Sequence, residues 1–321
     1  MQVAATKRTE LLTTAASMEE LRRLAEAGAD AFVVGESRYA VRMAGEFDLA
    51  TIRSAVAFAK PRGVRIYAAV NNLIDNALLP GLPAYLRALE AAGVDAVVFG
   101  DPAVLTAARS EAPSLGLHWN AEMTSTNYAT ANYWGRRGAT RVVLARELNM
   151  DQVLEFKANT ELEVQVQVHG MTNIYHSKRS LIHSYAEHQE RSGKPAELKE
   201  QAGGRGMESG LYLIEIERPD ERYPIYEDEN GTHMMSSDDI CMLESLHELL
   251  EPGVDSVKIE GLLKPAAYNA AVVRAYRRVM DAYYADPAGY RFRDEWLDPI
   301  RELQDPHREL SFGFFYKEQV Y

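Results

Sequence analysis

The sequence predicts a (β/α)8 barrel of the TIM type with a long insertion after its seventh strand. Two observations carry this prediction: a short phrase of glycine followed by β-branched residues recurs, and eight strand candidates mostly alternate with helical patterns. An open, doubly wound sheet is the alternative, but no G-x-G-x-x-G motif follows the first strand. With 321 residues and 46% apolar side chains, the chain is long enough for one such domain.

The recurring phrase marks the points where a helix ends and a buried strand begins. It occurs at residues 28–36, 93–101, 138–147 and 253–260. Its glycine suits the left-handed position just past a helix end, and the run that follows suits a strand covered on both faces. The strand candidates are Glu10–Thr14, Ala31–Val34, Arg65–Val70, Ala96–Phe99, Leu117–Ala121, Arg141–Leu144, Glu161–Val168 and Ser256–Ile259.

Helical patterns fill the intervals between these strands. Ser17 can cap the first helix, and Glu20 three residues later completes a capping box. The last helix places Pro265 in the favoured first position. The other helix candidates are Asp48–Lys60, Leu82–Ala92, Pro102–Glu111, Ser125–Arg137 and Met150–Asn159, and the last runs over Pro265–Tyr284.

The regular alternation breaks once, after the seventh strand. We assign residues 1–285 to the barrel domain, with a polar insertion at about 171–235, and residues 286–321 to a tail packed on the barrel. Within the insertion, Asn230-Gly231 is a two-residue turn signal and predicts a hairpin. An insertion at this point lies at the carboxyl ends of the strands, which is the functional face of such barrels.

Charge and cysteine content restrict the possible functions. The formal net charge of −12 disfavours unaided binding to nucleic acid. Cys241 lies in an apolar helical pattern, which indicates a buried, inert thiol. It is the single cysteine, so intrachain disulfides and a cysteine-based cluster are excluded. No signal peptide or membrane-spanning stretch is evident, so we expect a cytoplasmic protein with no membrane partner.

Polar residues that directly follow the apolar strand runs are the candidates for chemistry. In a barrel they converge on one opening. An arginine and a glutamate at such a rim, as at Arg146 and Glu147, can bind an anionic substrate and move protons, or they can simply pair with neighbours. Asp101, which precedes Pro102, is better explained as a helix cap. The candidates are Glu36, Asn71, Asn72, Glu122, Arg146, Glu147, His169, Lys258 and Glu260.

Four histidines, at positions 169, 176, 183 and 188, raise the question of a metal site. Their spacing matches no established ligand pattern, so we predict no metal, and we expect His183 and His188 to be exposed loop residues. His169 ends a strict apolar–polar alternation and is expected at the rim. The sequence contains no G-x-S-x-G, H-E-x-x-H or Walker motif, so no hydrolytic nucleophile is apparent.

Several segments resemble blocks of the peptidase U32 (collagenase-like protease) family. The resemblance runs from about Glu10 to Tyr284. After the His-Gly pair, members of that family typically carry two cysteines in a C-x6-C spacing, where this chain has Asn173 and Ser180. Cluster ligation needs thiolates, so the chain is similar to a cysteine-poor branch that binds no iron–sulfur cluster. The matching segments include Gly28–Glu36, Val70–Asn72, Val143–Glu147, Val168–Gly170, Tyr223–Asp228 and Lys258–Gly261.

The resemblance implies a role in RNA modification. Relatives take part in prephenate-dependent 5-hydroxylation of a wobble uridine in tRNA, which implies a cluster-lacking subunit that acts with a cysteine-bearing U32 paralogue. tRNA would then bind through the complex, and prephenate or another small carboxylate would be a substrate. The expected catalytic residues are Arg146, Glu147, His169, Glu36, Lys258 and Glu260, and the expected substrate-binding residues are Asn72, Glu122, His176 and Arg179.

Two alternatives stay open from the sequence. The first is a collagenase-like peptidase, with a metal at a rim formed by His169 and Glu122. The second is a non-catalytic partner that binds and stabilises its paralogue.

Overall fold

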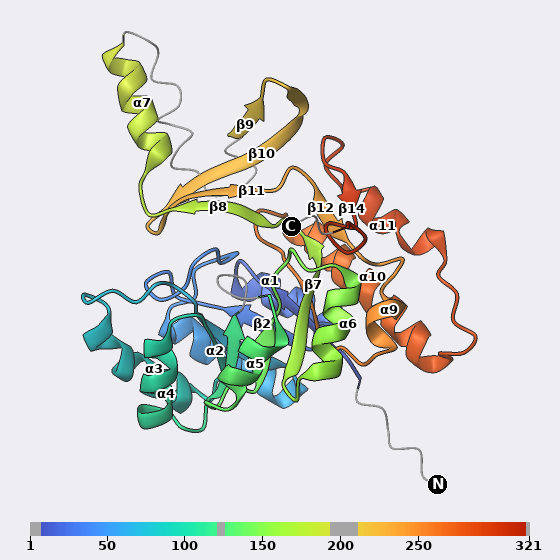
Figure 1. The fold of residues 1–321 in the computed structure, drawn as a ribbon, viewed down its shortest axis with the longest axis horizontal. Helices are drawn as coiled ribbons and strands as arrows, with labels where there is room; N and C mark the ends of the chain where they lie inside the picture. Colours follow the sequence, from blue (N-terminus) through green and yellow to red (C-terminus); the bar gives the residue numbers. More distant parts are fainter. Residues whose placement is uncertain (1–7, 121–125, 193–210, 319–321) are drawn as a thin grey trace.

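Eight parallel strands close into a barrel at the centre of the molecule (Figure 1). The computed structural model describes residues 8–120, 126–192 and 211–318. Each strand pairs with the next along the chain, and β13 pairs with both β7 and β1, which closes the ring. The (β/α)8 prediction is confirmed, and the open-sheet alternative is wrong. The barrel strands are β1 (Glu10–Thr14), β2 (Ala31–Val34), β3 (Arg65–Val70), β4 (Ala96–Phe99), β5 (Gly116–Asn120), β6 (Arg141–Val143), β7 (Glu163–Gly170) and β13 (Ser256–Ile259).

Helices surround the ring and connect its strands (Figure 1). The longer ones are α1 (Met18–Glu26), α2 (Leu49–Ala59), α3 (Leu82–Ala92), α4 (Pro102–Glu111), α5 (Tyr128–Gly135), α6 (Met150–Asn159) and α10 (Ala266–Ala285). Short turns add η1 (Lys60–Arg62), η2 (Leu79–Gly81), α9 (His247–Leu250), η5 (Asp294–Trp296) and α11 (Asp298–Arg301). Across the parts of the chain that the structure describes, no helix is long and apolar enough to cross a membrane.

Two helix starts differ from the prediction in detail. Ser17 Oγ accepts a hydrogen bond from the Glu20 amide at 3.1 Å, as expected of an N-cap. The Glu20 carboxylate does not complete a capping box, because it accepts hydrogen bonds from the Ala16 amide and from Asn269 Nδ2 in α10. This buried contact joins α1 to α10. Pro265 is the N-cap residue of α10 and not its first helical residue.

The insertion after β7 folds into its own antiparallel sheet of four strands, in the order β8-β11-β10-β9. Its elements are β8 (Asn173–Ser177), α7 (Leu181–Arg191), β9 (Tyr212–Glu215), β10 (Arg218–Asp228) and β11 (Gly231–Met235). The predicted hairpin is present, but Asp228 pairs with Gly231, so the two turn residues are Glu229 and Asn230. Figure 1 shows this sheet beyond the carboxyl ends of the barrel strands, the face on which it was expected.

Two short strands extend the barrel sheet beside the carboxyl end of β7. Here β12 (Asp239–Cys241) pairs antiparallel with β7, and β14 (Leu310–Ser311) from the tail pairs with β12. Cys241 is buried as predicted, but it lies in a strand, so its helical assignment is wrong. The apolar run around Cys241 pairs with a distant segment, which a local pattern cannot reveal.

The core has two layers, one outside and one inside the barrel. Outward-facing residues such as Leu11 and Val257 pack against the helices. Inward-facing residues such as Leu12, Val33 and Val98 pack against one another along the barrel axis. Successive side chains of a strand alternate between faces, so every strand contributes to both layers.

Candidate functional site

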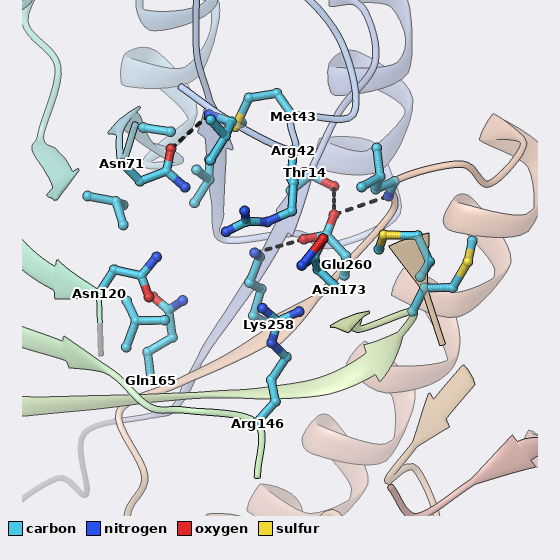
Figure 2. A pocket seen from close by; sticks show the side chains of 18 residues that line it. Thr14, Arg42, Met43, Asn71, Asn120, Arg146, Gln165, Asn173, Lys258 and Glu260 are labelled. Atoms are coloured by element: carbon cyan, nitrogen blue, oxygen red, sulfur yellow. Dashed lines mark hydrogen bonds and ion pairs between the residues drawn. The ribbon is translucent and has the colours of Figure 1, made fainter. Parts of the chain in front are cut away.

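A pocket opens at the carboxyl ends of the barrel strands (Figure 2). Barrel strands form its base, the loop after β2 forms one wall, and the insertion contributes Met171, Asn173 and Met235. Residues from several different strands therefore meet at one opening, as in the functional face of other (β/α)8 proteins. The polar residues that line the pocket are Thr14, Arg42, Asn71, Asn120, Arg146, Gln165, Asn173, Lys258 and Glu260.

Strand alternation explains how Gln165 and Lys258 reach the pocket. Val164 and Val166 flank Gln165 and face the surrounding helices, and the neighbours of Lys258 do the same. Because side chains alternate along a strand, Gln165 and Lys258 must point toward the barrel axis. The two strands that carry them, β7 and β13, are hydrogen-bonded neighbours.

The pocket carries more positive than negative charge. Three cationic side chains, Arg42, Arg146 and Lys258, extend into it from three separate segments (Figure 2). The one carboxylate in the lining, Glu260, accepts a hydrogen bond from Lys258 Nζ at 2.9 Å and one from Thr14 Oγ1 at 3.2 Å. The lining thus has an excess of two positive charges, and such a site suits a small anion with one or two carboxylates.

The structure brings together only part of the predicted site. Arg146, Lys258 and Glu260 line the pocket, and so does Asn71. The other predicted residues that the structure describes do not line the pocket, for reasons that differ from residue to residue.

Asn72 and His176 are held in contacts between the barrel and the insertion. Asn72 Nδ2 donates to Asn230 Oδ1 at 2.8 Å, and His176 Nε2 lies 3.0 Å from the Asn230 carbonyl oxygen. The His176 ring also stacks on His233 with 4.6 Å between centroids. Neither residue lines the pocket, and both contact the hairpin tip.

Glu36, Glu147 and Arg179 are not part of the pocket lining. Glu36 begins the loop after β2, where burial and the nearby Glu46 raise its pKa. Glu147 and Arg179 have exposed side chains. Glu122 lies outside the described residues.

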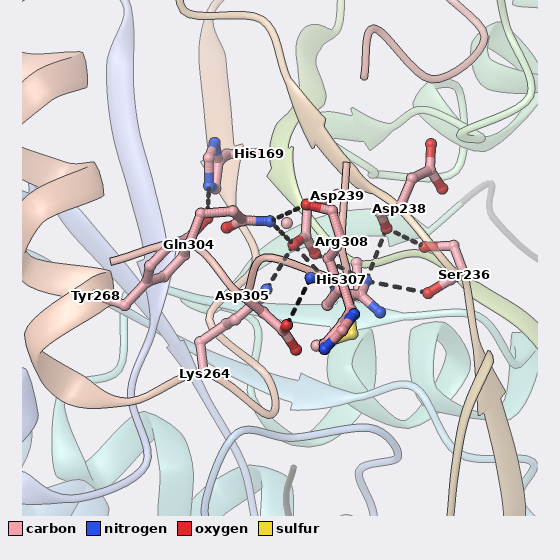
Figure 3. Close-up of polar contacts among 12 residues, drawn as sticks. His169, Ser236, Asp238, Asp239, Lys264, Tyr268, Gln304, Asp305, His307 and Arg308 are labelled. Atoms are coloured by element: carbon pink, nitrogen blue, oxygen red, sulfur yellow. Dashed lines mark hydrogen bonds and ion pairs between the residues drawn. The ribbon is translucent and has the colours of Figure 1, made fainter. Parts of the chain in front are cut away.

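His169 does not reach the rim, contrary to the sequence-based expectation. The register of β7 against β13 shifts between Lys258 and Ile259, so the alternation that should direct His169 inward is reversed. The imidazole is 1% exposed, and its Nε2 lies 3.0 Å from the hydroxyl of Tyr268 in α10 (Figure 3). Burial lowers the pKa of His169 to about 3, so the ring is neutral.

This buried histidine predicts a loss of stability in mild acid. Below about pH 6.5 the unfolded chain binds a proton on His169 that the folded chain does not bind, so the free energy of unfolding falls as the pH falls. Each such histidine contributes about 1.4 kcal/mol per pH unit in this range. His118, whose pKa burial and Arg141 hold well below its usual value, adds a similar term.

Urea unfolding between pH 4.5 and 7.5 measures this dependence. His169→Gln keeps a hydrogen-bonding group near Tyr268, and we expect it to reduce the slope by about 1.4 kcal/mol per pH unit. The exposed His183→Gln is the matched control and should keep the slope of the unsubstituted chain. Equal slopes for all three proteins would contradict the neutral, buried state of His169.

Five polar lining residues were not among the predicted site residues: Thr14, Arg42, Asn120, Gln165 and Asn173. Gln165 had a signal, since a glutamine between valines in a buried strand must point into the barrel. Asn120 ends β5 and Asn173 begins β8, positions that are polar in many loops and therefore uninformative. Arg42 had no signal, because the loop that carries it follows no periodic pattern.

The donor set does not fit an iron–sulfur cluster. Asn173 and Ser180 stand at opposite ends of the segment that contains β8, and neither offers sulfur. The one thiol, Cys241, is buried in β12, and burial raises its pKa to about 11, which disfavours the thiolate that a cluster requires. Within the described ranges, no group of three histidine, cysteine, aspartate or glutamate side chains is arranged to hold a metal ion.

Comparison with known proteins identifies relatives along nearly the whole chain. The chain is 48% identical to tRNA hydroxylation protein P2 of Bacillus subtilis, over 98% of this chain and 100% of that protein. It is 32% identical to tRNA hydroxylation protein P1 of the same organism, over 98% of this chain and 74% of that protein. It is 28% identical to tRNA hydroxylation protein P of Escherichia coli, over 95% and 74% of the two chains.

The solved structure of a U32 peptidase shares the fold. It matches with a TM-score of 0.50 and 17% identity, over 83% of this chain and 97% of the other. The family model described as Peptidase family U32 matches residues 16–320. The resemblance inferred from the sequence is confirmed: this chain belongs to peptidase family U32.

Proposed function

We propose that this chain is the cluster-lacking subunit of a tRNA-hydroxylation system that acts on a wobble uridine. The observation that carries the proposal is the 48% identity to tRNA hydroxylation protein P2, which extends over all of that relative. The second relative from the same organism, protein P1, supports a system with two U32 paralogues. A cysteine-bearing paralogue would supply the cluster that this chain cannot ligate.

The barrel pocket is proposed to bind the small carboxylate substrate, with prephenate as the candidate. Prephenate carries two carboxylate groups, and the lining has an excess of two positive charges from Arg42, Arg146 and Lys258 over Glu260. A guanidinium group can bind a carboxylate through two parallel hydrogen bonds, and an ammonium group adds a point charge. Asn71, Asn120 and Gln165 offer amide groups for the hydroxyl and keto oxygens.

RNA is proposed to bind through the complex and not through this chain alone. The net charge of −12 repels a polyanion, because affinity for nucleic acid comes largely from basic side chains that contact phosphates. The partner would then supply most of the phosphate contacts.

Deletion and complementation test the proposal. In a strain that has no other route to 5-hydroxyuridine, deleting the gene should abolish 5-hydroxyuridine derivatives in tRNA nucleosides measured by mass spectrometry. The unsubstituted gene should restore them. With Arg146→Ala, the level of 5-hydroxyuridine derivatives should be at least about tenfold lower than with the unsubstituted gene, because a charge-assisted hydrogen bond contributes about 1.5–3 kcal/mol.

The matched control is Arg136→Ala, which removes an exposed arginine outside the pocket lining and should restore full modification. Unchanged nucleosides in the deletion strain would refute the tRNA role. Full restoration by both Arg146→Ala and Lys258→Met would show that the subunit acts without its pocket, as a stabilising partner.

A further inference from the structure

We propose that Arg42 anchors the carboxylate ligand, and that Asn230 at the tip of the inserted hairpin is the positioning residue that keeps Arg42 in the pocket. The identity of the ligand rests on the proposed function. The positioning of the loop by Asn230 does not, because it follows from contacts within the chain.

Arg42 adopts a backbone conformation that needs support. Its φ angle is 57°, in the left-handed region that non-glycine residues avoid, and only Leu263 shares this property within the described ranges. Such conformations persist where the surroundings determine them, and they cluster at functional sites. Here the conformation directs an arginine into the pocket from a loop that contains no helix or strand (Figure 2).

Asn230 holds that loop through its side chain. Its Nδ2 donates to the carbonyl oxygens of Ser37 at 3.1 Å and Ala40 at 3.2 Å, just before Arg42. Its Oδ1 accepts a hydrogen bond from Asn72 Nδ2 at 2.8 Å, which ties the same point to the loop after β3. One amide therefore uses both of its ends to join two barrel loops to the insertion.

The hairpin tip is itself rigidly placed. The backbone N–H of Asn230 donates to Asp228 Oδ1 at 2.8 Å, and the same carboxylate oxygen lies 3.0 Å from His233 Nε2. His233 is fully buried and stacks between His176 and Tyr226, with centroid distances of 4.6 Å and 4.8 Å. The tip is thus a fixed support and can define the position of the loop.

The loop has a second restraint on the barrel side. The Val41 amide donates to Asn71 Oδ1 at 3.1 Å, and Asn71 lines the pocket. The residue before Arg42 is therefore fixed by the barrel, and Ser37 and Ala40 are fixed by the insertion. Together these contacts account for the unusual backbone of Arg42.

Two measurements on the full-length chain test the inference. The first is the affinity for prephenate by calorimetry, and the second is hydrogen–deuterium exchange in a peptide that spans residues 36–47. Asn230→Ala should weaken prephenate binding by about tenfold and accelerate exchange in this peptide, because three hydrogen bonds are lost. Asn76→Ala, which removes an exposed asparagine on the loop after β3, is the control and should change neither.

The variant Arg42→Gly distinguishes ligand binding by the Arg42 side chain from the stability of the loop backbone. Glycine accepts a positive φ without strain, so the Tm should stay the same or rise and exchange in residues 36–47 should stay slow, while prephenate binding falls tenfold or more. Arg42→Lys should also lose affinity, because lysine lacks the two-pronged geometry. Arg38→Lys, on the exposed part of the same loop, should bind as the unsubstituted chain does.

Each contrary result overturns a defined part of the inference. Unchanged exchange in Asn230→Ala would refute the positioning role, whatever the ligand is. Unchanged prephenate binding in Arg42→Gly would refute the anchoring role. If prephenate does not bind the unsubstituted chain, the assigned ligand and the anchoring role both fail, and the exchange result alone decides the role of Asn230.

Discussion

Replacing Glu10 by alanine is expected to lower the free energy of unfolding by about 3–5 kcal/mol. Glu10 lies inside the barrel at the amino-terminal ends of the strands and is 3% exposed. Its carboxylate accepts hydrogen bonds from Arg141 Nη1 and Tyr67 Oη at 2.6 Å and from Ser256 Oγ at 2.8 Å. Without Glu10, the fully buried Arg141 loses a main counter-charge in a place where water cannot replace it.

Urea unfolding followed by circular dichroism measures the effect of Glu10→Ala. Glu163→Gln is the control, because Glu163 also pairs with Arg141 but its side chain is 30% exposed, so a smaller loss is expected. The double substitution Glu10→Leu with Arg141→Met should recover part of the stability, since it removes both charges together. A loss below about 1 kcal/mol for Glu10→Ala would contradict the proposed role of this ion pair.

Replacing Asp239 by alanine should cost a similar amount, also about 3–5 kcal/mol, and should loosen the tail. Asp239 is fully buried between two cations (Figure 3). Lys264 Nζ lies 2.6 Å from Oδ2, and Arg308 Nη2 lies 3.0 Å from Oδ1. Burial alone would raise the pKa of Asp239, but Lys264 and Arg308 hold it well below its usual value, so the group stays ionised.

Asp239 anchors the C-terminal segment because Arg308, which belongs to that segment, binds its carboxylate. Arg308 Nη2 also donates to the carbonyl oxygens of Ser236 at 3.0 Å and Asp238 at 2.8 Å. Limited proteolysis should therefore release a C-terminal fragment faster in Asp239→Ala than in the unsubstituted chain. Asp294→Ala removes an exposed partner of Arg301 in the same segment and should leave the cleavage rate unchanged. Equal cleavage rates in Asp239→Ala and the unsubstituted chain would refute the anchor.

The barrel strands are the part of the fold that the sequence predicts best. The bounds of β3, β4 and β13 agree with the prediction at both ends. Buried parallel strands need apolar residues on both faces, and glycine ends the preceding helix, so both signals are local. Segments whose pairing depends on distant partners, such as β12 with the tail, leave no comparable signal.

The candidate site was predictable mainly for residues in or just after a barrel strand. Lys258 and Glu260 reach the pocket because they belong to or follow a regular strand. His169 fails because a single shift in register reverses the direction of its side chain. The loop that carries Arg42 is held by Asn230, about 190 positions away, and no local pattern in the sequence encodes such a contact.

The ion pair of Glu10 and Arg141 also determines how molecules can reach the pocket. Charged and apolar side chains fill the barrel below the pocket, so in the described part of the chain the path for a small molecule runs through the face that carries the insertion. An RNA seated over that face would obstruct the same path. On the proposed function, a carboxylate bound in the pocket would then have to enter before the RNA binds.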